Sequence, residues 1–241
     1  SSYKPLEPTL FENLICYLIK NYRLITFNEL DEIRVETFNS SNKPLLIISF
    51  DDGYKDFIEV AVPILFKYKV KVNQNIIPQC VEDGYPPLNV YVQDFVGKAS
   101  EKQLKQLRVP GLLIEGDIGN RISLGLRISK HIKNRPISEQ FKLKKTLIGH
   151  IKSFSNFQAT PMMSLSDIAQ CMEFHEFGAH SYNHASMEFE TDDYLMNDLL
   201  QCKNWFSERL DYNVTIYAFP NGSYNKNQIE LVRNAGYKQR I

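Results

Sequence analysis

Two neighbouring carboxylates are among the few residues of this sequence whose types and spacing could do chemistry. Asp51 and Asp52 directly follow the apolar run 45–50, and Gly53 after them allows the backbone to turn sharply. Two adjacent like charges at the rim of a core repel each other, so the pair is costly without a proton or a cation. The Asp pair therefore suggests a bound metal ion.

A second group of candidate ligands is the segment His180-Ser181-Tyr182-Asn183-His184. Histidines four residues apart lie on one side of a helical turn or tight loop, so both imidazoles can reach one ion. Each motif alone is more often a surface pair or a turn. Together they predict one site with two imidazoles and a carboxylate, which suits Zn²⁺, and Co²⁺ or Ni²⁺ almost as well. Three protein ligands leave open positions for water and substrate, as in catalytic sites.

The third candidate is the stretch 217–224, which also lies at the end of a predicted strand. Pro220, Asn221 and Gly222 indicate a turn whose backbone N–H groups can point outward. Outward amides near a metal can hold a developing oxyanion. A simple turn between a strand and a helix explains this stretch equally well when it is considered alone.

These residues need a scaffold, and the apolar periodicity predicts one. The run 45–50 is typical of a strand buried on both faces, as in parallel sheets. Further strands are expected at 70–77, 174–179 and 214–219, and helices at 10–19, 28–33, 57–68 with a kink or restart at Pro63, 164–172, 191–210 and just before Gly236. Alternating strands and helices favour a parallel sheet with covering helices, with its chemistry at the strand ends. Asn73, Gln74 and Asn75 are unusually polar for such a strand and could reach a site or solvent.

Residues 82–160 break this regularity. Helices are predicted at 100–107 and 138–154, whereas the region with Gly111, Gly116, Gly119 and Gly125 fits no clean period. We therefore expect an irregular, mostly helical insertion that could line the substrate cleft.

Bulk properties narrow the class of protein. The 241 residues suit one large α/β domain, and 28 basic against 28 acidic residues argue against nucleic acid as the main partner. No apolar run reaches 18 residues, so no membrane span is predicted. The four cysteines form no CxxC pair, which predicts free and mostly buried thiols. The start at 1–4 is not a signal peptide, and the sequence leaves a cytoplasmic or cell-envelope location open.

With these motifs in place, the chain resembles the polysaccharide deacetylase family, family four of the carbohydrate esterases. The family's Asp-Asp-Gly motif matches Ser49–Gly53, its His-Ser/Thr-x-x-His motif matches His180–His184, and its aromatic-Pro turn is similar to Phe219–Gly222. The stretches 177–179 and 234–237 are also similar. The resemblance runs from about residue 44 to the end of the sequence, and 82–160 is poorly matched.

The resemblance implies a distorted (β/α) barrel with fewer than eight regular strands. It implies that Asp52, His180 and His184 bind a divalent metal, with Zn expected first and Co or Ni as alternatives. It also implies that Asp51 is the general base. The metal would lower the pKa of water and polarise the acetyl carbonyl, and the base would take the proton of that water.

Further expectations concern the substrate and the extent of the domain. The backbone N–H of Asn221, in the turn set by Pro220, would stabilise the oxyanion, and Tyr54 would lie against the substrate. Residues 1–241 are expected to form a single catalytic domain with a helical N-terminal extension over about 1–40.

Three departures from the family pattern concern catalysis. Family members often carry Arg two residues before the Pro of the third motif, where it steadies the base, and this chain has Ala218 there. The usual Tyr after that Pro is Asn221. A late His normally protonates the leaving amine, but no His follows His184, and the sequence ends at Ile241 about where another strand would begin. A truncated C-terminus and another acid are both open, so no general acid is assigned.

The leading hypothesis is a metal-dependent hydrolase that removes acetyl groups from an N-acetylated, or less expectedly O-acetylated, poly- or oligosaccharide. One alternative is a catalytically weak glycan-binding barrel, because the motif-three Arg is missing. Another is a related amidohydrolase acting on a small non-sugar amide. Acetate release with and without a chelator separates the first two, and activity on cyclic amides would favour the third.

Overall fold

The chain folds around a sheet of five parallel strands that follow one another in sequence order. The computed structural model describes residues 6–32, 43–114, 119–154 and 157–241. The strands are β3 (Ser49–Phe50), β4 (Asn73–Ile76), β5 (Glu176–Ala179), β6 (Ile216–Tyr217) and β7 (Gln239–Arg240), and a separate parallel pair consists of β1 (Arg23–Leu24) and β2 (Leu45–Leu46). This arrangement is the α/β fold of a distorted barrel, as expected. Residues 1–4, Ile33 and Gly116, for which the sequence analysis made predictions, lie outside the described residues.

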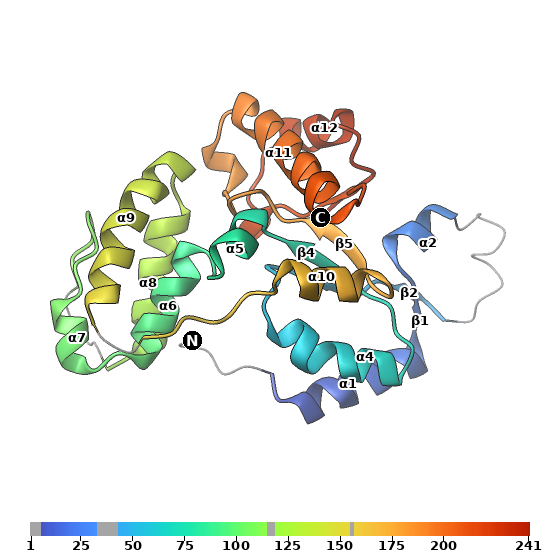
Figure 1. Cartoon of the computed structure of the whole chain (residues 1–241), viewed down its shortest axis with the longest axis horizontal. Coiled ribbons are helices and arrows are strands. Elements are labelled where there is room, and N and C mark those ends of the chain that lie inside the picture. Colours follow the sequence, from blue (N-terminus) through green and yellow to red (C-terminus); the bar gives the residue numbers. More distant parts are fainter. Residues whose placement is uncertain (1–5, 33–42, 115–118, 155–156) are drawn as a thin grey trace.

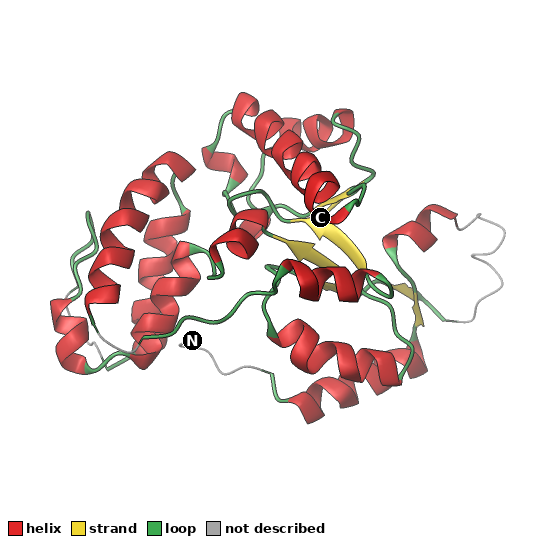
Figure 2. Ribbon diagram, in the orientation of Figure 1, coloured by secondary structure: helices red, strands yellow, loops and turns green. Residues whose placement is uncertain are grey.

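Helices cover the sheet. In the view of Figures 1 and 2, α11 (Asp192–Leu210) and α12 (Lys226–Asn234) lie above the strands, and α1 (Pro8–Asn21), α4 (Val62–Lys67) and α10 (Leu165–Met172) lie below them. The remaining helical segments outside the insertion are α2 (Phe27–Glu32), η1 (Phe57–Ala61), α5 (Pro78–Asp83), η2 (Met187–Phe189) and η3 (Pro220–Gly222). Ser164, Thr191 and Asn225 cap α10, α11 and α12 with side-chain oxygens, which satisfies N–H groups that the helix leaves unpaired.

The predicted restart at Pro63 is confirmed. The segment η1 is a π-helix, in which the N–H of Val62 donates to the carbonyl of Phe57, and α4 begins immediately after it with Pro63 in its first turn. Proline has no N–H to donate, so it fits the first turn of a helix and not its interior.

The expectation of one strand over 45–50, buried on both faces, is wrong. The run is split into β2 and β3, and its residues from Leu45 to Ile48 and Phe50 are only half-buried, while Ser49 is exposed. The reason is position, because β3 is an edge strand that pairs with β4 alone in the described sheet. An apolar run therefore does not by itself indicate a central strand.

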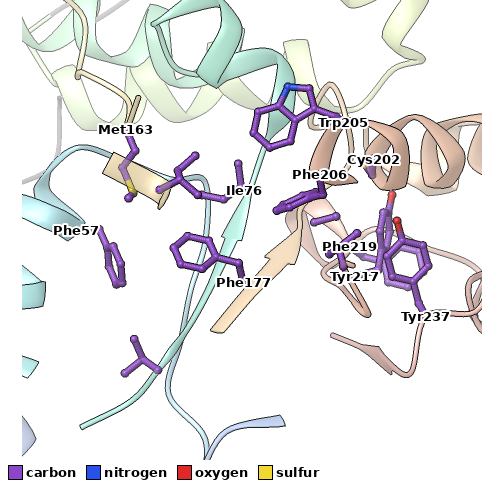
Figure 3. Close-up of a cluster of buried hydrophobic side chains, with 14 of the residues drawn as sticks. Phe57, Ile76, Met163, Phe177, Cys202, Trp205, Phe206, Tyr217, Phe219 and Tyr237 are labelled. Carbon is purple, nitrogen blue, oxygen red and sulfur yellow. The ribbon is translucent and has the colours of Figure 1, made fainter. Parts of the chain in front are cut away.

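The main core lies between the sheet and its helices. Figure 3 shows Phe57, Ile76 and Phe177 in one group, and these come from η1, β4 and β5. Phe206 of α11 lies nearby, between Trp205 of the same helix and the group formed by Tyr217, Phe219 and Tyr237. The side chains that hold the barrel together are thus mostly large and apolar.

The insertion is a helical unit with an apolar core of its own. It contains α6 (Leu88–Lys98), α7 (Glu101–Gln106), α8 (Arg121–Lys133) and α9 (Ile137–Ser153), which lie together beside the barrel in Figure 1. The helices at α7 and α9 are confirmed. The expected irregular middle is confirmed at Gly111 and Gly119, which lie in turns, and is wrong at the buried Gly125, since Gly125 belongs to the regular helix α8 that packs against α6.

A long-range contact ties the N-terminal helices to the sheet. The buried carboxylate of Glu176, at the start of β5, accepts hydrogen bonds of 2.9 Å from the N–H groups of Phe27 and Asn28. These N–H groups begin α2, where a negative charge is stabilised by the helix dipole. The opposite end of the same strand leads into His180.

Two further expectations can be compared with the structure. The four cysteines are free, with Cys80, Cys171 and Cys202 buried and Cys16 exposed. Among the helices of the described residues, none has the length and apolar character that crossing a membrane requires.

Candidate metal centre

The Asp and His motifs converge at the carboxyl ends of β3 and β5. Asp52 Oδ1 lies 3.4 Å from His180 Nε2 and 3.5 Å from His184 Nε2. One ligand atom from each of these residues lies within 4.8 Å of the others, and both histidines are buried. Asp52 is 128 residues before His180 in the sequence. The fold nevertheless brings its carboxylate oxygen to the same point as the two imidazole nitrogens.

The spacing fits a metal ion better than direct hydrogen bonds. Ligand atoms about 2.1 Å from a tetrahedral ion are about 3.4 Å apart, close to the observed separations. A good N–H···O bond is shorter, at about 2.7–3.2 Å. Within the described part of the chain, the buried Asp52 Oδ1 has no hydrogen-bond partner. Because a buried carboxylate oxygen without a partner is costly, the three residues fit a divalent cation.

The backbone at the ligands is strained. Asp52 has φ +75° and His184 has φ +60°, and Ser181 between the two histidines has φ +57°. Non-glycine residues rarely adopt this left-handed region, at a cost on the order of 1–3 kcal/mol each. Such conformations persist where the surroundings hold them, which is typical of functional sites. Gly53 has φ +78°, and a Cβ there would come within 2.8 Å of Ile76 Cδ1.

A buried carboxylate on α11 holds the histidine loop. Asp198 accepts hydrogen bonds from the Ser181 hydroxyl at 2.8 Å, the Tyr182 N–H at 2.9 Å and the Tyr217 hydroxyl at 2.9 Å. Burial raises the pKa of Asp198 to about 6, although these three donors act in the opposite direction. The loop that carries both imidazoles is thus fixed from behind by a helix of the barrel.

Each imidazole is prepared to act as a ligand. The Nδ1–H of His180 donates to the carbonyl of Ala218 at 3.0 Å, which turns Nε2 toward Asp52. Burial is the main cause that lowers the pKa of His184 to about 4. His184 is therefore neutral near pH 7, and neutral imidazole is the form that binds metals.

Asp51 lies beside the cluster and is exposed. Its Oδ1 accepts a hydrogen bond of 2.8 Å from the Asn75 side chain on β4. A cavity of about 250 Å³ opens next to Asp51 and Tyr54, with Phe11 and Phe57 in its wall. The second carboxylate of the pair thus faces space that a substrate or water could enter.

Tyr54 lines the same cavity as Asp51 and also interacts with Asp52. It packs against Ile77, Cys80 and Met162, and burial, followed by the negative charge of Asp52, raises the pKa of its hydroxyl. The hydroxyl therefore stays protonated and can donate a hydrogen bond.

The Pro220–Asn221 turn joins the histidine loop to the insertion. Asn221 has φ +60°, and its Nδ2 donates to Ser186 Oγ at 3.0 Å. Its Oδ1 accepts from Lys133 Nζ of α8 at 3.3 Å. The turn is therefore next to the candidate metal centre, as the strand-end position predicted, and a lysine of the insertion reaches it.

Of two further contributors to this region, the sequence analysis singled out Asn75 as able to reach a site and missed Lys133. Asn75 gave a signal, because asparagine is uncommon in an otherwise apolar strand. Lys133 gave none, since one basic residue in a basic helix does not indicate where it reaches. The buried His175, just before β5, packs edge-on against Phe57 and Phe174, at the end of the strand opposite to His180.

Fold and site together define a class of protein, namely a parallel-stranded α/β barrel with an Asp-His-His candidate metal centre at its strand ends. The family model described as polysaccharide deacetylase matches residues 159–240, which include the histidine motif and the Pro220 turn. This match covers residues 159–240 of the 241 and leaves out the Asp-Asp-Gly motif, so over this part the chain is similar to polysaccharide deacetylases.

Solved structures with the same fold include several deacetylases. The chain is similar to a Streptococcus pyogenes deacetylase, PplD, in complex with acetate, with 18% identity, a TM-score of 0.57, and coverage of 96% of this chain and 70% of that one. It is similar to IcaB from Ammonifex degensii, with 14% identity, a TM-score of 0.61, and coverage of 100% and 77%. It is also similar to a de-N-acetylase from Aggregatibacter actinomycetemcomitans, with 12% identity, a TM-score of 0.56, and coverage of 99% and 79%.

Comparison with curated proteins gives no match.

Proposed function

We propose that this chain is a metal-dependent hydrolase that removes acetyl groups from an N-acetylated poly- or oligosaccharide. One observation carries the proposal. Asp52 Oδ1 lies 3.4 and 3.5 Å from two imidazole nitrogens while a separate carboxylate, that of Asp51, stands beside them. A metal site with a free carboxylate next to it is the arrangement that hydrolysis of an amide by activated water requires.

Asp52, His180 and His184 are the residues that would hold the ion. We assign Zn²⁺ first, because two imidazoles and a carboxylate suit it, with Co²⁺ or Ni²⁺ as alternatives. When bound, such an ion supplies Lewis acidity to water and to the acetyl carbonyl. The Ala218 carbonyl and Asp198 keep the imidazoles in place.

Asp51 is assigned as the general base. Asn75 already donates to Oδ1, so Oδ2 is the oxygen that would take a proton from the attacking water. The oxyanion formed on the acetyl group would accept a hydrogen bond from the backbone N–H of Asn221. Asn221 follows Pro220 in a tight turn and has a positive φ. Tyr54 would donate its hydroxyl proton as a hydrogen bond near Asp52. Cleavage of the C–N bond gives acetate and a free amine.

The substrate class follows from the family, which implies an acetylated saccharide. One of the solved structures with a similar fold is a de-N-acetylase, which supports the amide over the O-acetyl ester. We propose that residues 1–241 act as one catalytic domain, with the helical unit over about 82–160 placed to bound the substrate cleft.

A second candidate is a glycan-binding barrel with weak hydrolysis. It is favoured by Ala218, which places a methyl group where family members often have Arg. In this case the metal would still bind, and saccharide binding would be measurable without turnover.

Acetate release separates the two candidates. The chain is incubated with N-acetylated oligosaccharides after chelation and after addition of Zn²⁺, Co²⁺ or Ni²⁺, and acetate is measured. We expect release that the chelator removes and the metal restores. Saccharide binding without release would support the glycan-binding candidate, and release that a chelator leaves unchanged would contradict a metal-dependent reaction.

The role of Asp51 has its own test. Asp51→Asn should retain metal but lose turnover, because the amide cannot accept the proton of the water. Asp193→Asn, an exposed position in the first turn of α11, is the matched control and should leave both unchanged. An Asp51→Asn variant with the wild-type rate would remove Asp51 from the role of base.

A further inference from the structure

Strand β4 carries two buried asparagines on one side. Asn73 and Asn75 are both 0% exposed, and alternate residues of a strand face the same way. Asparagine is depleted in strands, and a buried amide without partners is costly. Their presence in the centre of the sheet therefore calls for a reason beyond packing.

The two amides form a directed row that ends at Asp51. Asn73 Nδ2 donates to Asn75 Oδ1 at 2.8 Å, and Asn75 Nδ2 donates to Asp51 Oδ1, also at 2.8 Å. Both Nδ2 groups also lie near Ser49 Oγ, at 3.0 and 3.1 Å. Since Asn75 Oδ1 accepts from Asn73, the NH₂ group of Asn75 must face β3. A flipped amide would turn an oxygen toward the carboxylate of Asp51.

Strand β5, next to β4, leaves room for the side chain of Asn75. Asn75 is paired in register with Gly178 of β5. A Cβ at position 178 would lie 2.1 Å from Asn75 Oδ1, a separation that atoms of real side chains do not reach. Glycine at this position is therefore a requirement of the Asn75 side chain.

The residue that could otherwise orient Asp51 is missing. The family resemblance leads one to expect an arginine at 218 that steadies the base, and the chain has the buried Ala218. An alanine side chain has no donor, whereas the Asn75 amide sits within hydrogen-bond distance of the carboxylate. An uncharged donor orients the carboxylate without placing a positive charge beside it.

We propose that Asn75 is the positioning residue for the base Asp51 and takes the place of the absent arginine, with Asn73 and Gly178 holding it in the required orientation. This inference rests on the proposed function, because it gives Asn75 a role in the same reaction. It acts through Asp51 and does not touch the acetyl group or the metal ligands.

The first test replaces Asn75 by leucine, which has a similar volume and no donor. We expect kcat for acetate release to fall by about 10- to 100-fold, as is usual for partners that orient a reacting group. KM and the affinity for Zn²⁺ should stay within about two-fold of wild type, since neither the substrate surface nor the ligands change. Asn89→Leu is the matched control, because it replaces a buried asparagine of the insertion and should leave kcat unchanged.

The second test asks whether Asn75 acts through Asp51. In an Asp51→Asn background, Asn75→Leu should cause no further loss of the residual rate, since the carboxylate that it orients is gone. A further fall of the same size in that background, an unchanged kcat in the single variant, or a parallel loss of Zn²⁺ affinity would each overturn the proposal.

A third measurement does not depend on activity. A crystal structure of Asn75→Leu should show the Asp51 carboxylate rotated away from its wild-type position or in two conformers. A fixed Asp51 would overturn the proposal even if the wild-type chain hydrolyses its substrate. Absence of acetate release by the wild-type chain would instead refute the proposed function, and the two failures are thereby distinguished.

Discussion

The barrel and the insertion are both well packed, but they use their buried positions differently. The core of the insertion consists of apolar side chains such as Leu104, Ile128 and Leu147, and it lies apart from the strand ends. The barrel buries charged or polar groups next to the metal cluster, among them Asn75 and Asp198. Buried polar groups are costly unless they are paired. The insertion also buries some, among them Asn89 and Asp94, but those of the barrel hold candidate site residues, since Asn75 donates to Asp51 and Asp198 accepts from Ser181.

Contacts between the two regions are both apolar and polar: Ile137 at the start of α9 belongs to the main core, and its N–H donates to the Glu190 carboxylate. Lys144 of α9 forms an ion pair of 2.7 Å with Asp83 at the end of α5, and Lys133 of α8 reaches Asn221. We infer that the barrel would perform the reaction and the insertion would bound the cleft. Four predictions test this division, starting with the largest effect.

Removal of a ligand should have the largest effect. Asp52→Ala should abolish Zn²⁺ binding and lower acetate release by roughly three orders of magnitude, since a metal supplies several kcal/mol to such a reaction. Metal content by mass spectrometry and acetate release are the measurements. The control is Asp193→Ala on the surface of α11. Full Zn²⁺ occupancy in Asp52→Ala would contradict the assigned site.

Replacing one buried leucine by alanine in each core should show that only the barrel core supports Zn²⁺ binding. Leu147→Ala in the insertion and Leu199→Ala in the barrel each remove a buried leucine, with 0% and 1% exposure, and each should cost about 2–5 kcal/mol of unfolding free energy. Only Leu199→Ala, which lies next to Asp198 in sequence, should weaken Zn²⁺ binding. Urea denaturation and Zn²⁺ titration measure these effects. Equal loss of Zn²⁺ affinity in both variants would show that barrel and insertion behave as one unit.

Acid sensitivity should arise in the barrel. Burial lowers the pKa of His175 to about 4, and within the described residues neither ring nitrogen has a partner. The unfolded chain takes up the proton near pH 6.5, so the contribution of His175 to stability is complete above pH 6.5 and is lost as the pH falls toward 4. His175→Phe should reduce this loss by about 1–2 kcal/mol, with allowance for solvent screening.

Unfolding free energies of wild type and His175→Phe between pH 7 and pH 4 provide the measurement. The two proteins should diverge progressively below pH 6.5. His150→Phe serves as the matched control, because it replaces a histidine of the insertion whose Nε2 contacts the Gln106 carbonyl. Parallel profiles for wild type and His175→Phe would contradict the prediction.

The smallest effect is expected where the insertion contacts the barrel. Lys133→Met removes an exposed contact with Asn221, so KM for an oligosaccharide should rise by about two- to five-fold with Zn²⁺ affinity unchanged. Lys130→Met, one turn earlier on α8, is the control. A large fall in kcat for Lys133→Met would instead show that the insertion takes part in the chemical step. That result would contradict the proposed division of roles between barrel and insertion.

Much of the barrel and its candidate metal centre could be predicted from the sequence. Strand periodicity and helix caps are local signals, and so are the two short motifs that contain Asp52 and the pair His180 and His184. The structure brings these three residues together. The edge position of β3 could not be predicted, because an apolar run gives no information about strand neighbours. Helix α8 was missed because Gly125 is normally unfavourable in a helix, and only its packing against α6 explains it.

The contact between Glu176 and α2 has a consequence for synthesis. The N–H of Phe27 finds its acceptor 149 residues later in the chain. A ribosome that adds about 5–20 residues per second needs roughly 7–30 s to cover that stretch. During this interval the N-terminal helices have no docking partner on β5, so nascent chains should be most open to chaperones and proteases before Glu176 emerges.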